Sequence, residues 1–108
     1  MSAATEGLVR DVVANVPELQ PLLAEHLADN YGELLPHVFF GDVTRWALRE
    51  KAVNSLSLKR LLTLLDASYA KGVPDVQELI AVSFLENLPP GWPAKLGPHL
   101  AAARGDTD

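Results

Sequence analysis

Residues 75–88 read DVQELIAVSFLENL and decide the fold of this chain. From residue 79 to residue 85 the single polar side chain is Ser83, and charged residues stand on both sides of that run. A segment that is apolar all round must be surrounded by other segments of the protein. Periodicity alone does not separate helix from strand in a short apolar run, but the distance between Pro74 and Pro89 favours a helix. We therefore expect a central, buried helix here.

Four further helices are predicted upstream, because apolar residues recur there at helical spacing. Thr5 is expected to cap the first helix, and Ser55 or Ser57 the fourth. Gly41 is expected to split the third helix, with Asp42 capping its second piece. The predicted helices cover residues 8–16, 18–30, 34–50 and about 55–71.

The segment after Pro89 is rich in proline and is expected to be irregular. Trp92 should fold back as a lid on the core, and short helical turns are predicted around residues 94–96 and 98–104. Residues 105–108 are expected to form a disordered tail. The chain of 108 residues thus predicts an all-α fold, with a single compact domain over residues 1–104. That domain would hold about five main helices and a short helical C-terminal piece.

The composition narrows the classes of partner. The formal net charge of −5 argues against binding to nucleic acid, and Lys59-Arg60 is too small a basic cluster to reverse that. The chain has no cysteine, so disulfides and thiolate metal sites are excluded. It shows no secretory signal and no apolar run long enough to span a bilayer. We expect a cytoplasmic protein with no membrane partner.

Several residues could carry chemistry, but none predicts a catalytic, cofactor or metal site. His26 and Asp29 have the spacing to share a metal, yet a boundary histidine with a local hydrogen bond is the more common outcome. His37 and Asp42 could form a base with its orienting carboxylate. Ser83 lies in the most apolar stretch and is expected to bond to the i−4 carbonyl of its own helix.

Charged side chains on the third predicted helix are candidates for binding a partner. Asp42, Arg45 and Arg49 fall on one face, and arginine is enriched at interface hot spots. The alternative is a solvated helix surface with an internal Asp42–Arg45 ion pair. Glu78 and Glu86 flank the apolar run of residues 79–85 and are the parts of that stretch expected to reach a partner.

An acidic patch for a basic partner is a further possibility that the sequence leaves open, because spacing cannot show whether distant carboxylates converge. Its members would be Asp75, Glu78 and Glu86, with Glu50 and Asp66. The candidate partner-binding residues are Asp42, Arg45, Arg49, Glu78 and Glu86.

Two stretches carry a family resemblance: LLPHVFFGDVTRW at residues 34–46 and DVQELIAVSFLENLPP at residues 75–90. They resemble a family of small, uncharacterised bacterial helical proteins, several of which look like immunity proteins encoded beside polymorphic or contact-dependent toxins. The resemblance covers about half of the chain. It implies an all-α fold and no known activity, and it carries over no functional residues.

We therefore expect a non-catalytic protein-binding module, and specifically an immunity protein that neutralises a cognate toxin by occlusion. Its partner would be a protein such as a basic toxin domain. The alternative is a structural or regulatory subunit that acts through homo-oligomerisation. A third hypothesis is a small enzyme whose site joins His37 or His26 to carboxylates from other helices.

Overall fold

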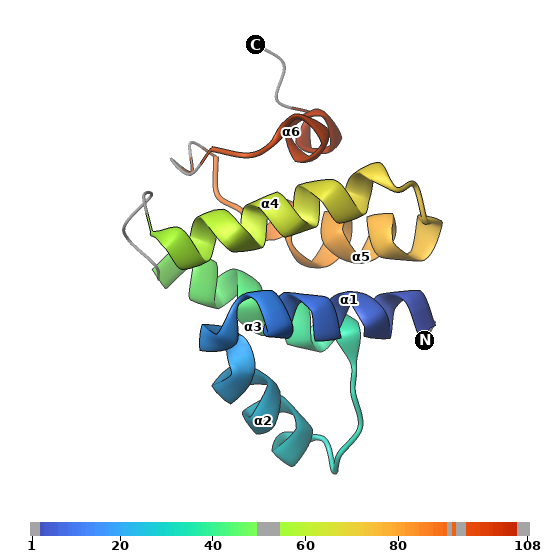
Figure 1. Cartoon of the computed structure of the whole chain (residues 1–108), viewed down its shortest axis with the longest axis vertical. Coiled ribbons are helices and arrows are strands. Elements are labelled where there is room, and N and C mark those ends of the chain that lie inside the picture. The colour runs from blue at the N-terminus through green and yellow to red at the C-terminus, as the bar shows by residue number, and fades with distance from the viewer. Residues whose placement is uncertain (1–2, 50–54, 91, 93–94, 106–108) are drawn as a thin grey trace.

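Every regular element is helical in the residues that the structure describes. The computed structural model describes residues 3–49, 55–90, 92 and 95–105. The predicted all-α domain of five main helices and a short C-terminal helix is confirmed (Figure 1). The α-helices are α1 (Ala3–Asn15), α2 (Gln20–Asp29), α3 (Pro36–Arg49), α4 (Leu56–Ala70), α5 (Pro74–Ser83) and α6 (Pro98–Arg104), and the 3₁₀ turns are η1 (Pro17–Leu19) and η2 (Leu85–Asn87).

Helix α5 is the central packing element, as the sequence predicts. It lies against α1, α3 and α4 (Figure 1). Leu79 and Ile80 are completely buried, and Val76 and Ser83 are nearly so. The expectation of burial on every side is wrong at Val82, which is 45% exposed. One narrow side of α5 therefore faces solvent.

The central helix ends earlier than predicted, at Ser83 rather than near residue 88. In an uninterrupted α-helix Leu85 would lie one turn from the exposed Val82 and two turns from Glu78. The chain instead leaves the helix at Phe84, where φ is −118° and ψ is −64°, and forms η2. The break turns Leu85 into the core, where it is 4% exposed. Burial of this leucine explains why the helix stops.

Helix α3 is continuous, so the predicted split at Gly41 and cap at Asp42 are wrong. A mid-helix glycine costs only about 1 kcal/mol relative to alanine. Phe40 and Val43, on either side of it, are both completely buried. A continuous helix buries both Phe40 and Val43. The free energy gained by packing these side chains outweighs the low helix propensity of Gly41.

The first two helices differ from the prediction at their starts. Thr5 is not the cap of α1, which already includes Ala3; it is a buried residue inside the helix. Pro17 ends α1 as predicted and opens η1, so the second helix proper begins only at Gln20. Tyr31, with φ of 56°, and Gly32, with φ of 82°, then reverse the chain.

Ser55 caps α4 as predicted, since its hydroxyl accepts a hydrogen bond from the Leu58 N–H at 3.4 Å.

The C-terminal segment closes over α4 and the end of α5. The Trp92 ring meets the edge of Phe84, with centroids 6.4 Å apart, which confirms the predicted lid. Gly105 forms the left-handed C-cap of α6 rather than part of a tail. The helical turn predicted at residues 94–96 is wrong at residues 95 and 96, which are not helical. Residue 94 and residues 106–108 of the predicted tail lie outside the described residues.

Candidate functional site

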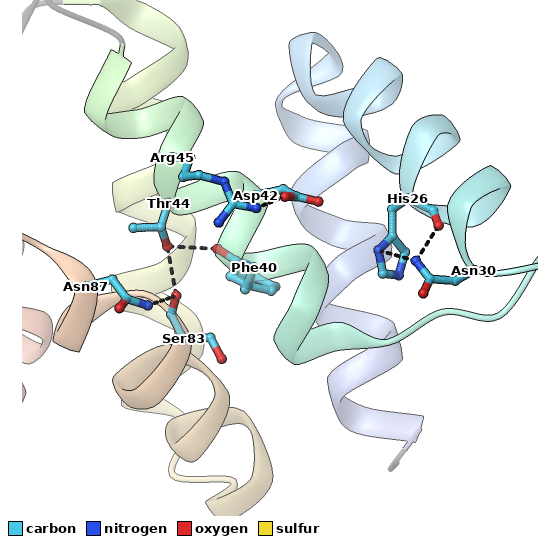
Figure 2. Close-up of polar contacts among 8 residues, drawn as sticks. All are labelled: His26, Asn30, Phe40, Asp42, Thr44, Arg45, Ser83 and Asn87. Atoms are coloured by element: carbon cyan, nitrogen blue, oxygen red, sulfur yellow. Dashed lines mark hydrogen bonds and ion pairs between the residues drawn. The ribbon is translucent and has the colours of Figure 1, made fainter.

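The outer face of α3 collects three of the five predicted partner-binding residues. Asp42, Arg45 and Arg49 follow one another at spacings of three and four, and all three lie on the side turned away from the core. Arg45 donates to the Asp42 carboxylate, so the predicted internal ion pair is present (Figure 2). The Arg45 side chain is 64% exposed and that of Asp42 is 31% exposed. Solvent therefore reaches the charges of this face.

Two apolar side chains belong to the same face. Val38 is 51% exposed and Leu48 is 39% exposed. In helical projection Val38 lies beside Arg45, opposite the buried residues of α3, and Leu48 lies at the edge of the same side, next to Thr44. We use the name α3 outer face for Val38, Asp42, Arg45, Leu48 and Arg49. It combines apolar surface with an unpaired arginine, because Arg49 forms no ion pair within the described ranges.

The other two predicted residues are not joined to this face. Glu78 lies on the exposed side of α5, near Val82, and Glu86 lies in η2, beyond the break in the chain. Both are exposed, and across the described residues neither side chain forms a hydrogen bond or an ion pair. No contact links them to Asp42, Arg45 or Arg49.

Asp66, a possible member of the predicted acidic patch, has a different role. Its Oδ1 atom accepts from the backbone N–H groups of His99 at 2.9 Å and Leu100 at 3.0 Å. Its Oδ2 atom lies 3.2 Å from Nδ1 of His99. The carboxylate thus caps the first turn of α6 from α4. Partial burial raises the pKa of Asp66, but the hydrogen bonds from Leu100 and His99 outweigh it and hold the pKa below its usual value of 3.8.

Acid should reveal the contribution of Asp66 to stability. A carboxyl group whose pKa is lower in the folded state stabilises the protein above its unfolded pKa and loses this contribution as the pH falls through the folded pKa. Asp66→Asn should therefore lose less unfolding free energy than the wild type between neutral pH and about pH 3. Urea titrations at a series of pH values measure the difference. Parallel pH profiles of the two proteins would contradict the assignment.

A polar seam joins α3 to the end of α5, and it corrects two predictions. Nδ1 of His37 lies 2.6 Å from Oγ of Ser83, so His37 pairs with this serine and not with Asp42. The Ser83 hydroxyl correspondingly bonds across helices rather than to its own i−4 carbonyl. Because α5 stops at Ser83, the carbonyl of that residue needs other donors. It accepts from Thr44 Oγ1 at 2.8 Å and from Asn87 Nδ2 at 3.1 Å (Figure 2).

A histidine hydrogen-bonded to a serine is one part of a nucleophilic site. Here the serine is 6% exposed, and its carbonyl is committed to holding α3 against α5. In the described part of the chain no carboxylate hydrogen-bonds to His37. Attack on a substrate would require α3 and α5 to separate. The geometry is that of a structural cross-link between the two helices.

His26 is buried rather than placed at the boundary of the apolar stripe, with 2% of its surface exposed. Its Nε2 atom accepts from the Leu35 N–H at 3.0 Å, and its ring meets the edge of Phe39. Asn30, one turn away, supplies the expected local contact at 3.3 Å from Nδ1 (Figure 2). Residues 3–49, 55–90, 92 and 95–105 contain no group of three or more side chains placed to hold a metal, so the alternative of metal binding with Asp29 gains no support.

A furrow along the seam between α1 and α4 is the surface that sequence reasoning missed. The two helices face the viewer in Figure 1. A cavity of about 770 Å³ lies at the C-terminal end of α1, and its lining includes Leu56, Lys59, Arg60, Ala14 and Ala67. A smaller cavity of about 190 Å³ lies at the other end of the seam, beside Gly7 and Lys71. We call the two cavities together the furrow.

The sequence does contain one signal for the furrow. Leu56, Arg60, Thr63 and Ala67 recur at helical spacing on the side of α4 opposite the buried leucines. Which helix lies beside this stripe depends on tertiary packing, so the spacing alone could not reveal a concave surface.

Among the described helices, none is long and apolar enough to cross a membrane.

Comparison with known proteins places the chain by family only. No curated protein and no solved structure gives a significant match. The family model described as "Domain of unknown function (DUF7674)" matches residues 9–103, which include α2 to α5, the second half of α1 and all of α6 but its last residue. Because this match spans most of the sequence, the protein belongs to the DUF7674 family of domains of unknown function.

Proposed function

We propose that this protein is a non-catalytic protein-binding module and that it binds its partner through the α3 outer face. The observation that carries the proposal is the exposure of Val38 and Leu48, at 51% and 39%, beside the Asp42–Arg45 pair and Arg49. Apolar surface next to arginine is typical of the centre of an interface, where few residues provide most of the binding energy.

The rigidity of this face supports the same proposal. Phe39, Phe40 and Val43 fix α3 from its buried side, and Thr44 ties it to the end of α5. From Val38 to Arg49 the helix rises about 16 Å, which suits the central part of a standard protein interface. A preformed surface loses little conformational entropy on binding, so the contacts made there translate more fully into affinity.

The finer proposal is an immunity protein that blocks a toxin by occlusion. The resemblance of residues 34–46 and 75–90 to bacterial proteins of that kind supports it. A basic toxin domain would be favoured by the net charge of −5 and by the exposed carboxylates of Glu78 and Glu86. Arg49 would meet a carboxylate within the surface of that domain. In this mechanism the helical surface covers the active site or substrate groove of the toxin.

Co-expression tests the proposal directly. Cells that produce the cognate toxin should grow only when this protein is also present. Arg49→Glu should weaken the complex by about tenfold or more, as expected for a hot-spot arginine. The matched control is Lys95→Glu, which reverses an exposed cation outside α3 and should bind like the wild type. Purified proteins and calorimetry give the two dissociation constants.

Each alternative has its own outcome. If the wild-type protein does not rescue growth, the immunity proposal is wrong. If Arg49→Glu and Lys95→Glu bind equally well, the partner does not use the α3 outer face. A molar mass that doubles with concentration, and returns to that of the monomer in Leu48→Glu, would favour self-association. Hydrolysis that depends on both His37 and Ser83 would favour the enzyme hypothesis.

A further inference from the structure

The larger cavity of the furrow is lined by both apolar and basic side chains. Leu56, which is 61% exposed, lies in it together with Leu64 and alanines of α1 and α4. Lys59 and Arg60 supply its charge, and of the described residues that line this cavity none is acidic. The residues that line this cavity therefore carry a positive charge, although the formal net charge of the whole chain is −5. Such a surface suits an anionic ligand with apolar groups.

The two cations are available to a ligand. Within the described ranges neither Lys59 nor Arg60 forms a hydrogen bond or an ion pair. The nearby carboxylate of Glu18 accepts a hydrogen bond from the Ser57 hydroxyl. That bond is the main reason why the pKa of Glu18 is lowered, and Arg60 contributes less. Glu18 therefore has a hydrogen-bond partner of its own, although its negative charge offsets part of the charge of Arg60, which remains exposed.

We propose that the furrow binds an acidic amphipathic helix of a partner protein. Apolar side chains of that helix would enter the cavity of about 770 Å³, and its carboxylates would meet Lys59 and Arg60. This is the helix-in-groove mode of recognition, in which residues spaced by three and four anchor one face of the ligand.

The dimensions of the furrow favour a helix over a compact ligand. The two cavities lie at opposite ends of the same seam, from Ala4 to Asn15 along α1. That stretch rises about 16 Å, or three helical turns. The lining includes small side chains, such as Ala14 and Ala67, beside the longer ones of Lys59 and Arg60. A Cβ atom added to Gly7 would meet no atom within 4 Å, so the seam is open there.

This inference stands apart from the proposed function because it uses α1 and α4 and none of the α3 outer face. At the smaller cavity Asp11 lies beside Lys71, so the two charges offset each other. The electrostatic preference for an acidic helix therefore comes from Lys59 and Arg60. Reversal of these two charges should weaken binding of the acidic ligand, whereas reversal of two exposed cations elsewhere, Arg10 and Lys95, should not.

The test uses the full chain and a labelled synthetic helix as the probe. The probe is a peptide of about 15 residues, with leucine at one face and glutamate and alanine elsewhere. Fluorescence anisotropy should show saturable binding that salt weakens. Lys59→Glu/Arg60→Glu should raise Kd by about tenfold or more, whereas the matched double reversal Arg10→Glu/Lys95→Glu, at exposed cations outside both the furrow and the α3 outer face, should keep the wild-type Kd. Circular dichroism verifies that both variants are folded.

A second variant tests the cavity without a change of charge. Ala67→Trp should fill the furrow and abolish binding of the peptide, and Ala28→Trp, an exposed site on α2, should not. The proposal is overturned if the acidic peptide shows no saturable binding up to about 1 mM. It is also overturned if a lysine-for-glutamate peptide binds as tightly, or if both double reversals weaken binding equally. None of these outcomes affects the co-expression test, which concerns binding of a partner through the α3 outer face.

Discussion

Phe84→Ala is expected to lower the free energy of unfolding by about 3–5 kcal/mol. Phe84 is completely buried at the point where α5 ends and η2 begins. Its ring also supports Trp92, with the centroids 6.4 Å apart. Removal of the ring leaves a cavity that the surrounding helices can fill only in part. Since small domains are stable by about 5–15 kcal/mol, the variant should be close to unfolding.

Urea denaturation followed by circular dichroism measures this loss. The matched control is Val82→Ala, an apolar truncation two residues away on the exposed side of α5, which should cost less than about 1 kcal/mol. A shift in tryptophan fluorescence of the folded Phe84→Ala protein would report the changed setting of Trp92. A loss below about 1 kcal/mol for Phe84→Ala would show that the core does not close around this ring.

Asp66→Ala should cost about 1–3 kcal/mol and release α6 from α4. The carboxylate satisfies the N–H groups of both His99 and Leu100, so its removal leaves two donors at the start of α6 without their acceptor. Hydrogen exchange in α6 should accelerate before that in α5. Glu78→Ala is the control, because it removes an exposed carboxylate without a partner in the described residues and should change stability by less than about 0.5 kcal/mol.

Gly97 provides an independent check on the same contact. A Cβ atom added at Gly97 would lie 2.5 Å from Cγ and from Oδ1 of Asp66, too close for the carboxylate to stay in place. Gly97→Ala should therefore destabilise the wild type more than it destabilises the Asp66→Ala variant. A double-mutant cycle measures this coupling, and additive losses would contradict the close approach of the two residues.

The helices themselves were predictable because their signal is local. Leu58, Leu61 and Leu65 recur at helical spacing, and all three are buried in α4. Ser55 caps this helix through a hydrogen bond to a residue three positions along the chain. The Asp42–Arg45 pair is equally local, since it joins side chains one turn apart on α3. Periodicity and short-range chemistry are sufficient for features of this kind.

The errors occur where a distant segment changes the local outcome. The stretch at residues 75–88 predicts one long helix, but Leu85 reaches the core only if α5 stops at Ser83. Gly41 and Asp42 favour a break on local grounds, and the burial of Phe40 and Val43 keeps α3 continuous. The prediction for the Ser83 hydroxyl was also wrong, because its partner His37 lies 46 residues away in sequence.

The sequence by itself determined the helical class of the fold, the central place of residues 75–88 and the charged face of α3. Each depends on spacings within one helix, where geometry follows directly from residue number. Only the tertiary structure decided that Asp66 caps α6, that His37 meets Ser83 and that a cavity with basic side chains lies between α1 and α4. These features join residues on different helices, and their positions depend on how the whole core packs.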